Sequence, residues 1–257
     1  MRRKVAPKKT GRASRSKKTQ HSIKGIFKKT LKSLSLVIFG IFLFSLLWVL
    51  AYKFLPIPGT PLMLIRKIEF RNDPNFNTRY RWVKFENAGP FTLAVVASED
   101  ANFLKHNGFD FKAIQKAIEF NQKNPSKKRG ASTISQQVAK NAFLWNGRSW
   151  VRKGLEVYFT FLIELMWSKK RILEVYVNIA ETGKGLYGIE AASKYYFKKN
   201  ASKMTRYEAT LIASILPNPL KYNASKPSQF LQNRQKWIRR NMDFIGKLEF
   251  ETKSSKN

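Results

Sequence analysis

The chain has 257 residues, of which 49 are Lys or Arg and 16 are Asp or Glu, so its formal net charge is +33 at pH 7. This length is enough for one domain of ordinary size with a real core. The charge requires a polyanionic partner, an anionic membrane surface or a basic tail. The sequence contains no cysteine, which excludes disulfides and thiolate metal sites and leaves the compartment open.

The first 33 residues form a basic tail. They contain no Asp or Glu, whereas Lys and Arg recur from Arg2 to Lys32. Such a segment has too little apolar surface to bury, so we expect residues 1–33 to be disordered and strongly cationic. The tail explains much of the net charge, although the rest of the chain is basic as well.

An apolar run follows the tail at residues 34–55, LSLVIFGIFLFSLLWVLAYKFL. As a helix, it is long enough to cross a hydrocarbon core of about 30 Å. A cleaved signal peptide is the alternative, but the run is too long for one and no small-residue cleavage site follows. By the positive-inside rule, the tail is cytoplasmic and everything after Pro58 is external. We therefore expect a single-pass protein of the inner membrane with a periplasmic domain.

Residues 56–250 are expected to form one mainly α domain, followed by a short C-terminal tail at 251–257. A short strand is expected at residues 65–70, but strands that alternate with helices are absent. The spacing of apolar residues and the capping signals predict helices over residues 91–104, 132–144 and 150–167, a helix with the face Phe111, Ile114, Ala117 and Ile118, and helices capped by Ser168 and by Thr205 with Glu208.

Two segments that carry carboxylates flank a run rich in hydroxyl and amide groups. The segments are residues 98–110 (SEDANFLKHNGFD) and 152–156 (RKGLE), and the run between them is residues 130–141 (GASTISQQVAKN). Both segments are interpreted as helix starts, where the positive end of the macrodipole favours carboxylates and side chains can be held toward a cleft. Glu99 and Glu156 are therefore candidates for acid/base chemistry on a sugar.

Four motifs occur in order along the chain. They are ED-x-x-F-x-x-H-x-G at residues 99–108, G-A-S-T-I-T-Q-Q at 130–137, R-K-x-x-E at 152–156 and K-x-x-I-L-E-x-Y-L-N at 169–178. In these motifs the chain resembles the peptidoglycan glycosyltransferase family, which includes monofunctional enzymes that polymerise lipid II and a domain of class A penicillin-binding proteins. The resemblance departs from the family pattern at Ser135 and Val177, where Thr and Leu are usual. It implies a lysozyme-like α domain preceded by one transmembrane helix.

The resemblance also implies a reaction. A sugar 4-hydroxyl attacks an anomeric carbon with inversion, and a lipid pyrophosphate departs. Glu99 resembles the family's general base, and Glu156 resembles the acid that works at the pyrophosphate end of the donor. Lys140, Arg152 and Lys153 are expected to neutralise the leaving phosphate, with or without Mg²⁺ or Mn²⁺, and no metal-ligating residue is predicted.

Six further residues are expected to bind substrate, although five of them, all but Phe103, have a plainer interpretation as helix-start, capping or surface residues. The expected partners are lipid II, the growing glycan strand and membrane lipids, with room for other cell-wall synthesis proteins. Nucleic acid is not expected, because the tail is poor in aromatic residues and the motifs centre on carboxylates. The six residues are Asp100, Phe103, Ser132, Thr133, Gln136 and Gln137.

A lysozyme-like peptidoglycan hydrolase or lytic transglycosylase is the alternative function. One acid placed like Glu99 can also cleave the same β-1,4 bond. The cations Lys140, Arg152 and Lys153 argue against this alternative, because cleavage of a neutral glycan needs no cradle for pyrophosphate.

Overall fold

The computed structural model describes the backbone of residues 12–127, 129–147 and 149–250, and it divides the chain into two units, Met1–Trp48 and Val49–Asn257. Helix α1 (Arg12–Phe54) makes up the described part of the first unit and ends in the second. The prediction of a disordered tail is therefore wrong from Arg12 onward, because the tail has good helix formers and no proline interrupts the helix. Residues 1–11 and 251–257 lie outside the described residues.

Helix α1 contains a segment that can cross a membrane. Residues Lys28–Phe54 form a 27-residue stretch that contains 18 residues with a mean hydropathy of 2.6, which is long and apolar enough for a span. Leu36, Phe39 and Ile41 are each more than half exposed, so the apolar surface of this helix is not covered by the protein. A helix that is apolar on all sides requires apolar surroundings. The segment supports the prediction of a membrane anchor.

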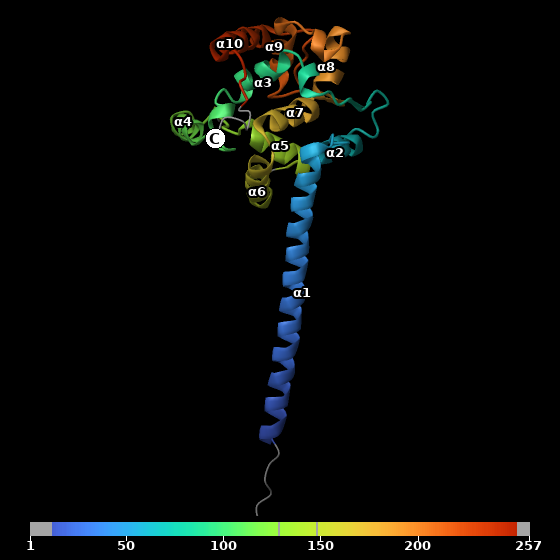
Figure 1. Cartoon of the computed structure of the whole chain (residues 1–257), viewed down its shortest axis with the longest axis vertical. Helices are drawn as coiled ribbons and strands as arrows, with labels where there is room; N and C mark the ends of the chain where they lie inside the picture. Colours follow the sequence, from blue (N-terminus) through green and yellow to red (C-terminus); the bar gives the residue numbers. More distant parts are fainter. Residues whose placement is uncertain (1–11, 128, 148, 251–257) are drawn as a thin grey trace, which may run out of the picture. The chain divides into compact units, whose positions relative to one another are not determined.

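The second unit consists mainly of helices, which confirms the predicted fold class (Figure 1). Helices α3, α9 and α10 pack together, α5 packs between α6 and α7, and α7 joins the two groups because it contacts both α3 and α5. The helices are α2 (Pro61–Glu69), α3 (Phe91–Glu99), α4 (Phe111–Lys123), α5 (Ile134–Phe143), α6 (Trp150–Met166), α7 (Lys169–Ile179), α8 (Gly188–Phe197), α9 (Arg206–Ile215) and α10 (Gln229–Ile245), with 3₁₀ turns η1 (Phe85–Asn87), η2 (Phe103–Lys105) and η3 (Ala201–Lys203).

Side-chain caps set several of these helix boundaries. Ser168 accepts a hydrogen bond from the backbone N–H of Arg171, and Thr205 forms a capping box with Glu208, so both predicted caps are confirmed. The predicted strand at residues 65–70 is wrong, because residues 65–69 belong to α2 and Phe70 is its C-cap. Thr60 caps that helix and Pro61 stands in its first turn, where proline is well tolerated.

A small sheet, not anticipated from the sequence, lies beside the helices. Its strand order is β1 (Arg79–Tyr80), β3 (Leu186–Tyr187), β2 (Glu181–Gly183), with β1 parallel and β2 antiparallel to β3. Gly188 follows this sheet with φ +75°, and a Cβ there would collide with the backbone oxygen of Asn178. Only glycine fits this turn, which leads directly into α8.

Candidate active site

Glu99 is the last residue of α3 and is held by groups from two distant helices. Its Oε2 accepts a hydrogen bond from Gln137 Nε2 on α5 at 3.1 Å, and its Oε1 lies 3.4 Å from Arg234 Nη2 on α10. The predicted helix from 91 to 104 thus ends at Glu99, so the interpretation of Glu99 as a helix-start carboxylate is wrong. Glu99 instead faces the negative end of the helix dipole, which disfavours its ionised form.

The surroundings of Glu99 suit a general base. Burial raises the pKa of this carboxyl, the hydrogen bond from Gln137 and the charge of Arg234 oppose the rise, and the neighbouring Asp100 adds to it. A carboxylate whose pKa is raised toward the working pH accepts a proton more readily than a solvated one does. The side chain keeps 15% of its surface exposed, so a substrate hydroxyl can reach it.

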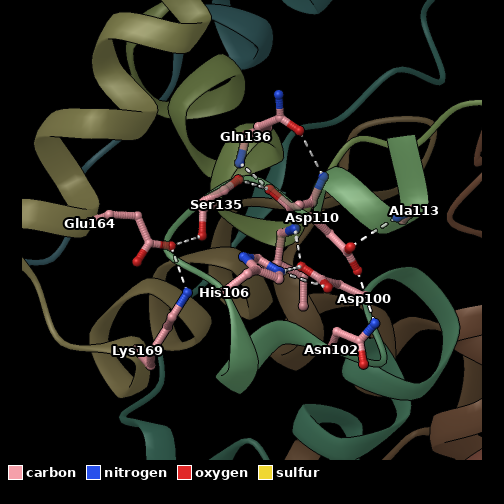
Figure 2. Close-up of polar contacts among 12 residues, drawn as sticks. Asp100, Asn102, His106, Asp110, Ala113, Ser135, Gln136, Glu164 and Lys169 are labelled. Atoms are coloured by element: carbon pink, nitrogen blue, oxygen red, sulfur yellow. Dashed lines mark hydrogen bonds and ion pairs between the residues drawn. The ribbon is translucent and has the colours of Figure 1, made fainter. Parts of the chain in front are cut away.

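Asp100 joins two parts of the site. Its carboxylate lies 3.0 and 3.1 Å from Nε2 of His106, and its Oδ2 also accepts a hydrogen bond from the backbone N–H of Ile134 at 3.0 Å. Figure 2 shows the His106 ring against this carboxylate. Asp100 therefore ties the end of α3 to the start of α5. The side chain of Asp100 is buried, and its oxygens are used for these contacts with His106 and Ile134.

Three of the predicted substrate-binding residues support the site from inside the protein. Thr133 caps α5, forms a capping box with Gln136 and donates a hydrogen bond to the backbone oxygen of Gly108 at 2.6 Å. Both side chains are buried, and Phe103 is fully buried with the ammonium group of Lys169 over its ring. The contacts of Thr133 and Gln136 fix the start of α5, and Thr133 also lines the second cleft described below.

Ser135, where the family pattern has Thr, is also engaged in the interior. Its hydroxyl donates a hydrogen bond to Glu164 on α6, and Glu164 forms an ion pair with Lys169 on α7 at 2.8 Å (Figure 2). A threonine hydroxyl could make the same bond. The departure at Ser135 therefore keeps the chemistry of that position.

Two clefts flank the hydrogen bond between Gln137 and Glu99. The first has a volume of about 230 Å³ and is lined by Gln137 and Lys140, together with Arg66 and Glu181. The second has a volume of about 370 Å³ and contains Glu99 and Asp100, and its wall includes the exposed Ser132 and Trp237. Because Gln137 in one cleft donates to Glu99 in the other, a substrate that fills both would cross the carboxylate.

Glu156 is the centre of a cationic cluster, which we define as Lys140, Arg152 and Lys153. Glu156 is buried in the second turn of α6, where Oε2 accepts a hydrogen bond from Arg152 Nη1 at 2.9 Å and Oε1 accepts one from Lys153 Nζ. Burial lowers the pKa of Lys140 on α5, and the charges of Arg152 and Lys153 lower it further, while Glu156 opposes the change. The structure thus brings together the three predicted cations and the second predicted acid.

Arg66 and Glu181 line the first cleft and lie outside the four sequence motifs. Arg66 binds Glu181 in a two-pronged ion pair with distances of 3.0 and 3.2 Å in the first cleft, across 115 positions of sequence. Burial raises the pKa of Glu181, and Arg66 opposes that rise. Tyr176 on α7 donates a hydrogen bond to Gln137 Oε1 at 3.1 Å. Such long-range pairs become visible only when the helices are placed in space.

The residues present do not fit a protein-held site for Mg²⁺ or Mn²⁺. Among the described residues, no group of three or more His, Asp and Glu side chains could hold a metal ion. Glu156 is the carboxylate at the centre of the cationic cluster, and its two oxygens are already paired with Arg152 and Lys153.

Comparisons with known proteins agree with the sequence motifs. A family model described as Transglycosylase matches residues 69–243. The chain is 51% identical over 213 residues to the biosynthetic peptidoglycan transglycosylase of Haemophilus influenzae, covering 82% of this chain and 87% of that protein. It is 50% identical over 222 residues to the protein of the same name from Bacteroides thetaiotaomicron (86% and 89% covered), and 48% identical over 222 residues to that from Shewanella oneidensis (86% and 94%).

Proposed function

The chain belongs to the transglycosylase family and is a peptidoglycan glycosyltransferase, and from this premise we propose that it extends glycan strands by an inverting transfer from lipid II. The donor is a glycan linked to a lipid pyrophosphate, and the acceptor is the 4-hydroxyl of a second sugar. The observation that carries this proposal is a carboxyl with a raised pKa, Glu99, that is bound by Gln137, a residue of the same cleft as Lys140 of the cationic cluster.

In the proposed reaction Glu99 removes the proton from the attacking 4-hydroxyl. The new bond forms between that oxygen and the anomeric carbon, while the bond from the same carbon to the pyrophosphate oxygen breaks. Glu99 lines the larger cleft, and its hydrogen bond from Gln137 fixes the direction of the carboxylate. A fixed base within reach of the hydroxyl lowers the barrier by proton transfer and by orientation.

The leaving pyrophosphate is proposed to bind at the cationic cluster. Arg152 and Lys153 are held by Glu156, so their positions are set before substrate arrives. Ser132 and Gln137 are proposed to bind sugar, because both line the clefts and neither is buried. Asp100, Phe103, Thr133 and Gln136 are proposed to act on substrate only through the shape of the site, since all four are buried.

Lengthening of glycan by the purified full chain tests the proposed function. Labelled lipid II is expected to be converted into long glycan strands, whereas preformed strands incubated with the protein keep their length. This outcome follows because a neutral strand has no phosphate for the cationic cluster to stabilise. Shortening of the preformed strands without polymerisation of lipid II would instead support a hydrolase.

Exposed apolar residues suggest how the catalytic unit meets its lipid-linked substrate. On α6, Trp150 is 91% exposed, and Val151, Phe161 and Leu165 are exposed as well; on α4, so is Phe111. Apolar side chains that gather on a protein surface can mark a contact with a membrane. We propose that these residues contact the bilayer, where they would place the clefts near the headgroups and the lipid pyrophosphate.

The proposed topology places residues 1–33 in the cytoplasm and the catalytic unit in the periplasm, with one span in the inner membrane. It rests on the apolar segment Lys28–Phe54 and on the basic residues that precede it. A reporter that is active only outside the cytoplasm is expected to be active when fused after Asn257 and silent when fused before Met1. The reverse pattern would contradict the topology.

A further inference from the structure

We propose that Arg234 is a positioning residue for the transfer reaction, because its guanidinium holds the carboxylate of Glu99 in the ionised form and in a fixed direction. The inference rests on the proposed role of Glu99 as general base. Arg234 stands on α10, 135 positions away along the chain, and lies outside the four motifs that identify the family resemblance.

The placement of α10 brings Arg234 to the last turn of α3. Leu231, Ile238 and Met242 are buried on one side of α10, and they fix the helix within the group of α3, α9 and α10. Asn241 donates a hydrogen bond to the backbone oxygen of Ala97 at 3.3 Å, two residues before Glu99. With α10 fixed in this way, the Arg234 side chain reaches the carboxylate directly.

Besides the hydrogen bond from Gln137, the charge of Arg234 is what favours the ionised form of Glu99. Asp100, the next residue, carries the same charge as Glu99. Tyr176, from α7, is a neutral hydroxyl whose pKa is raised by burial and by both carboxylates. Among the described residues, the only ion pair of Glu99 is the one with Arg234. The charge that favours the ionised base therefore comes from α10.

Helix α9, which also packs on α3, supplies no competing charge. Its two charged residues are engaged elsewhere: Arg206 pairs with Asp243 at 2.7 Å, and Glu208 pairs with Lys199 at 2.8 Å. The balance of charge at Glu99 is thus set by Asp100 on one side and Arg234 on the other.

The contacts of Arg234 differ from those of an arginine that only connects two helices. Its Nε is buried and has no hydrogen-bond partner within the described part of the chain, and its other contact is with the Trp237 ring at 5.9 Å. An arginine with a purely structural role would be expected to donate its buried N–H groups to backbone carbonyls, because buried donors are usually hydrogen-bonded. The polar contact that Arg234 does make is directed at Glu99.

The pH dependence of polymerisation tests this role. Arg234→Met is expected to move the acid limb of the kcat/KM profile to higher pH by roughly one unit, the effect of losing one opposite charge nearby. The rate should recover toward that of the unchanged protein at alkaline pH, and Arg234→Lys should give a smaller shift. The matched control is Arg240→Met, an exposed arginine of the same helix, which should leave the profile in place. An equal loss at every pH, with the acid limb unmoved, would overturn the proposal.

A stability measurement gives a readout that does not depend on activity. Arg234→Met is made in the unchanged protein and in the Glu99→Gln background, and Tm is followed against pH. Because burial raises the pKa of Glu99 in the folded state, ionisation of this group opposes folding above its unfolded pKa, and loss of Arg234 increases that effect. The substitution should therefore lower Tm more in the unchanged protein at high pH, and equally in both backgrounds at low pH.

The two measurements separate failure of this inference from failure of the proposed function. If the Tm loss is the same in both backgrounds at every pH, Arg234 only packs α10 against α3, and the inference is wrong whatever Glu99 does. If Glu99→Gln keeps full turnover, the role of Glu99 as base is wrong, while the Tm comparison still reports whether the two side chains are coupled.

Discussion

Replacement of Glu99 by Gln is expected to reduce polymerisation of lipid II by about 10²–10⁴-fold, the usual cost of removing a general base. The amide has nearly the shape of the carboxyl and can still accept the hydrogen bond from Gln137, so the fold and substrate binding should persist. What is lost is the ability to take a proton from the attacking hydroxyl. Turnover of labelled lipid II measures the loss of catalysis, and a separate binding measurement shows whether the variant still binds lipid II.

Glu119→Gln is the matched control for this experiment. Glu119 is an exposed carboxylate on α4 that accepts a hydrogen bond from Gln115 on the same helix. It lies outside both clefts. Its substitution removes the same charge and should leave turnover unchanged. Near-normal polymerisation by the Glu99→Gln protein would exclude Glu99 as the base.

Replacement of Arg152 by Ala is expected to lower kcat by roughly 10²–10³-fold, as loss of a donor aimed at developing charge does elsewhere. Nη1 of Arg152 binds Glu156, so the guanidinium is held in the cationic cluster before the phosphate arrives. Negative charge on the departing phosphate grows in the transition state. The interaction is therefore strongest there, and kcat should fall more than KM rises.

Arg152→Lys separates charge from geometry. It keeps the positive charge but cannot offer two parallel donors, so an intermediate loss is expected. Thermal unfolding of both variants checks that the fold survives loss of the contact with Glu156. If Arg152→Ala raises KM and leaves kcat unchanged, Arg152 only holds the substrate, and stabilisation of the leaving phosphate must be assigned to Lys140 and Lys153.

Local signals in the sequence predict much of the helical framework. The caps at Ser168 and Thr205 lie within one turn of the backbone groups they bind, so spacing alone identifies them. The end of α3 was predicted too far along the chain, because apolar periodicity continues past Glu99 while Asp100 leaves the helix to bind His106 and the start of α5. The helix ends because Asp100 contacts other elements, and such contacts cannot be predicted from the neighbouring sequence.

Some contacts of the candidate site can likewise be predicted from the sequence, and others cannot. The cluster of Arg152, Lys153 and Glu156 is predictable, since residues three and four apart share one face of a helix. The pairing of Arg234 with Glu99 and that of Arg66 with Glu181 depend on how separate helices pack, which a single sequence does not encode in its spacing. Strands of two or three residues, such as β1 and β3, are too short for alternation to be recognised.

The hydrogen bonds from Tyr176 through Gln137 to Glu99 run in one direction. Because its pKa is raised well above the ordinary value, the Tyr176 hydroxyl stays protonated and donates to the amide oxygen. The amide is thereby oriented so that its nitrogen, which can only donate, faces Glu99. The buried Tyr176 hydroxyl thus determines which end of the Gln137 amide faces the carboxylate, and this chain of donors suits Glu99 in its ionised form, before it accepts a proton.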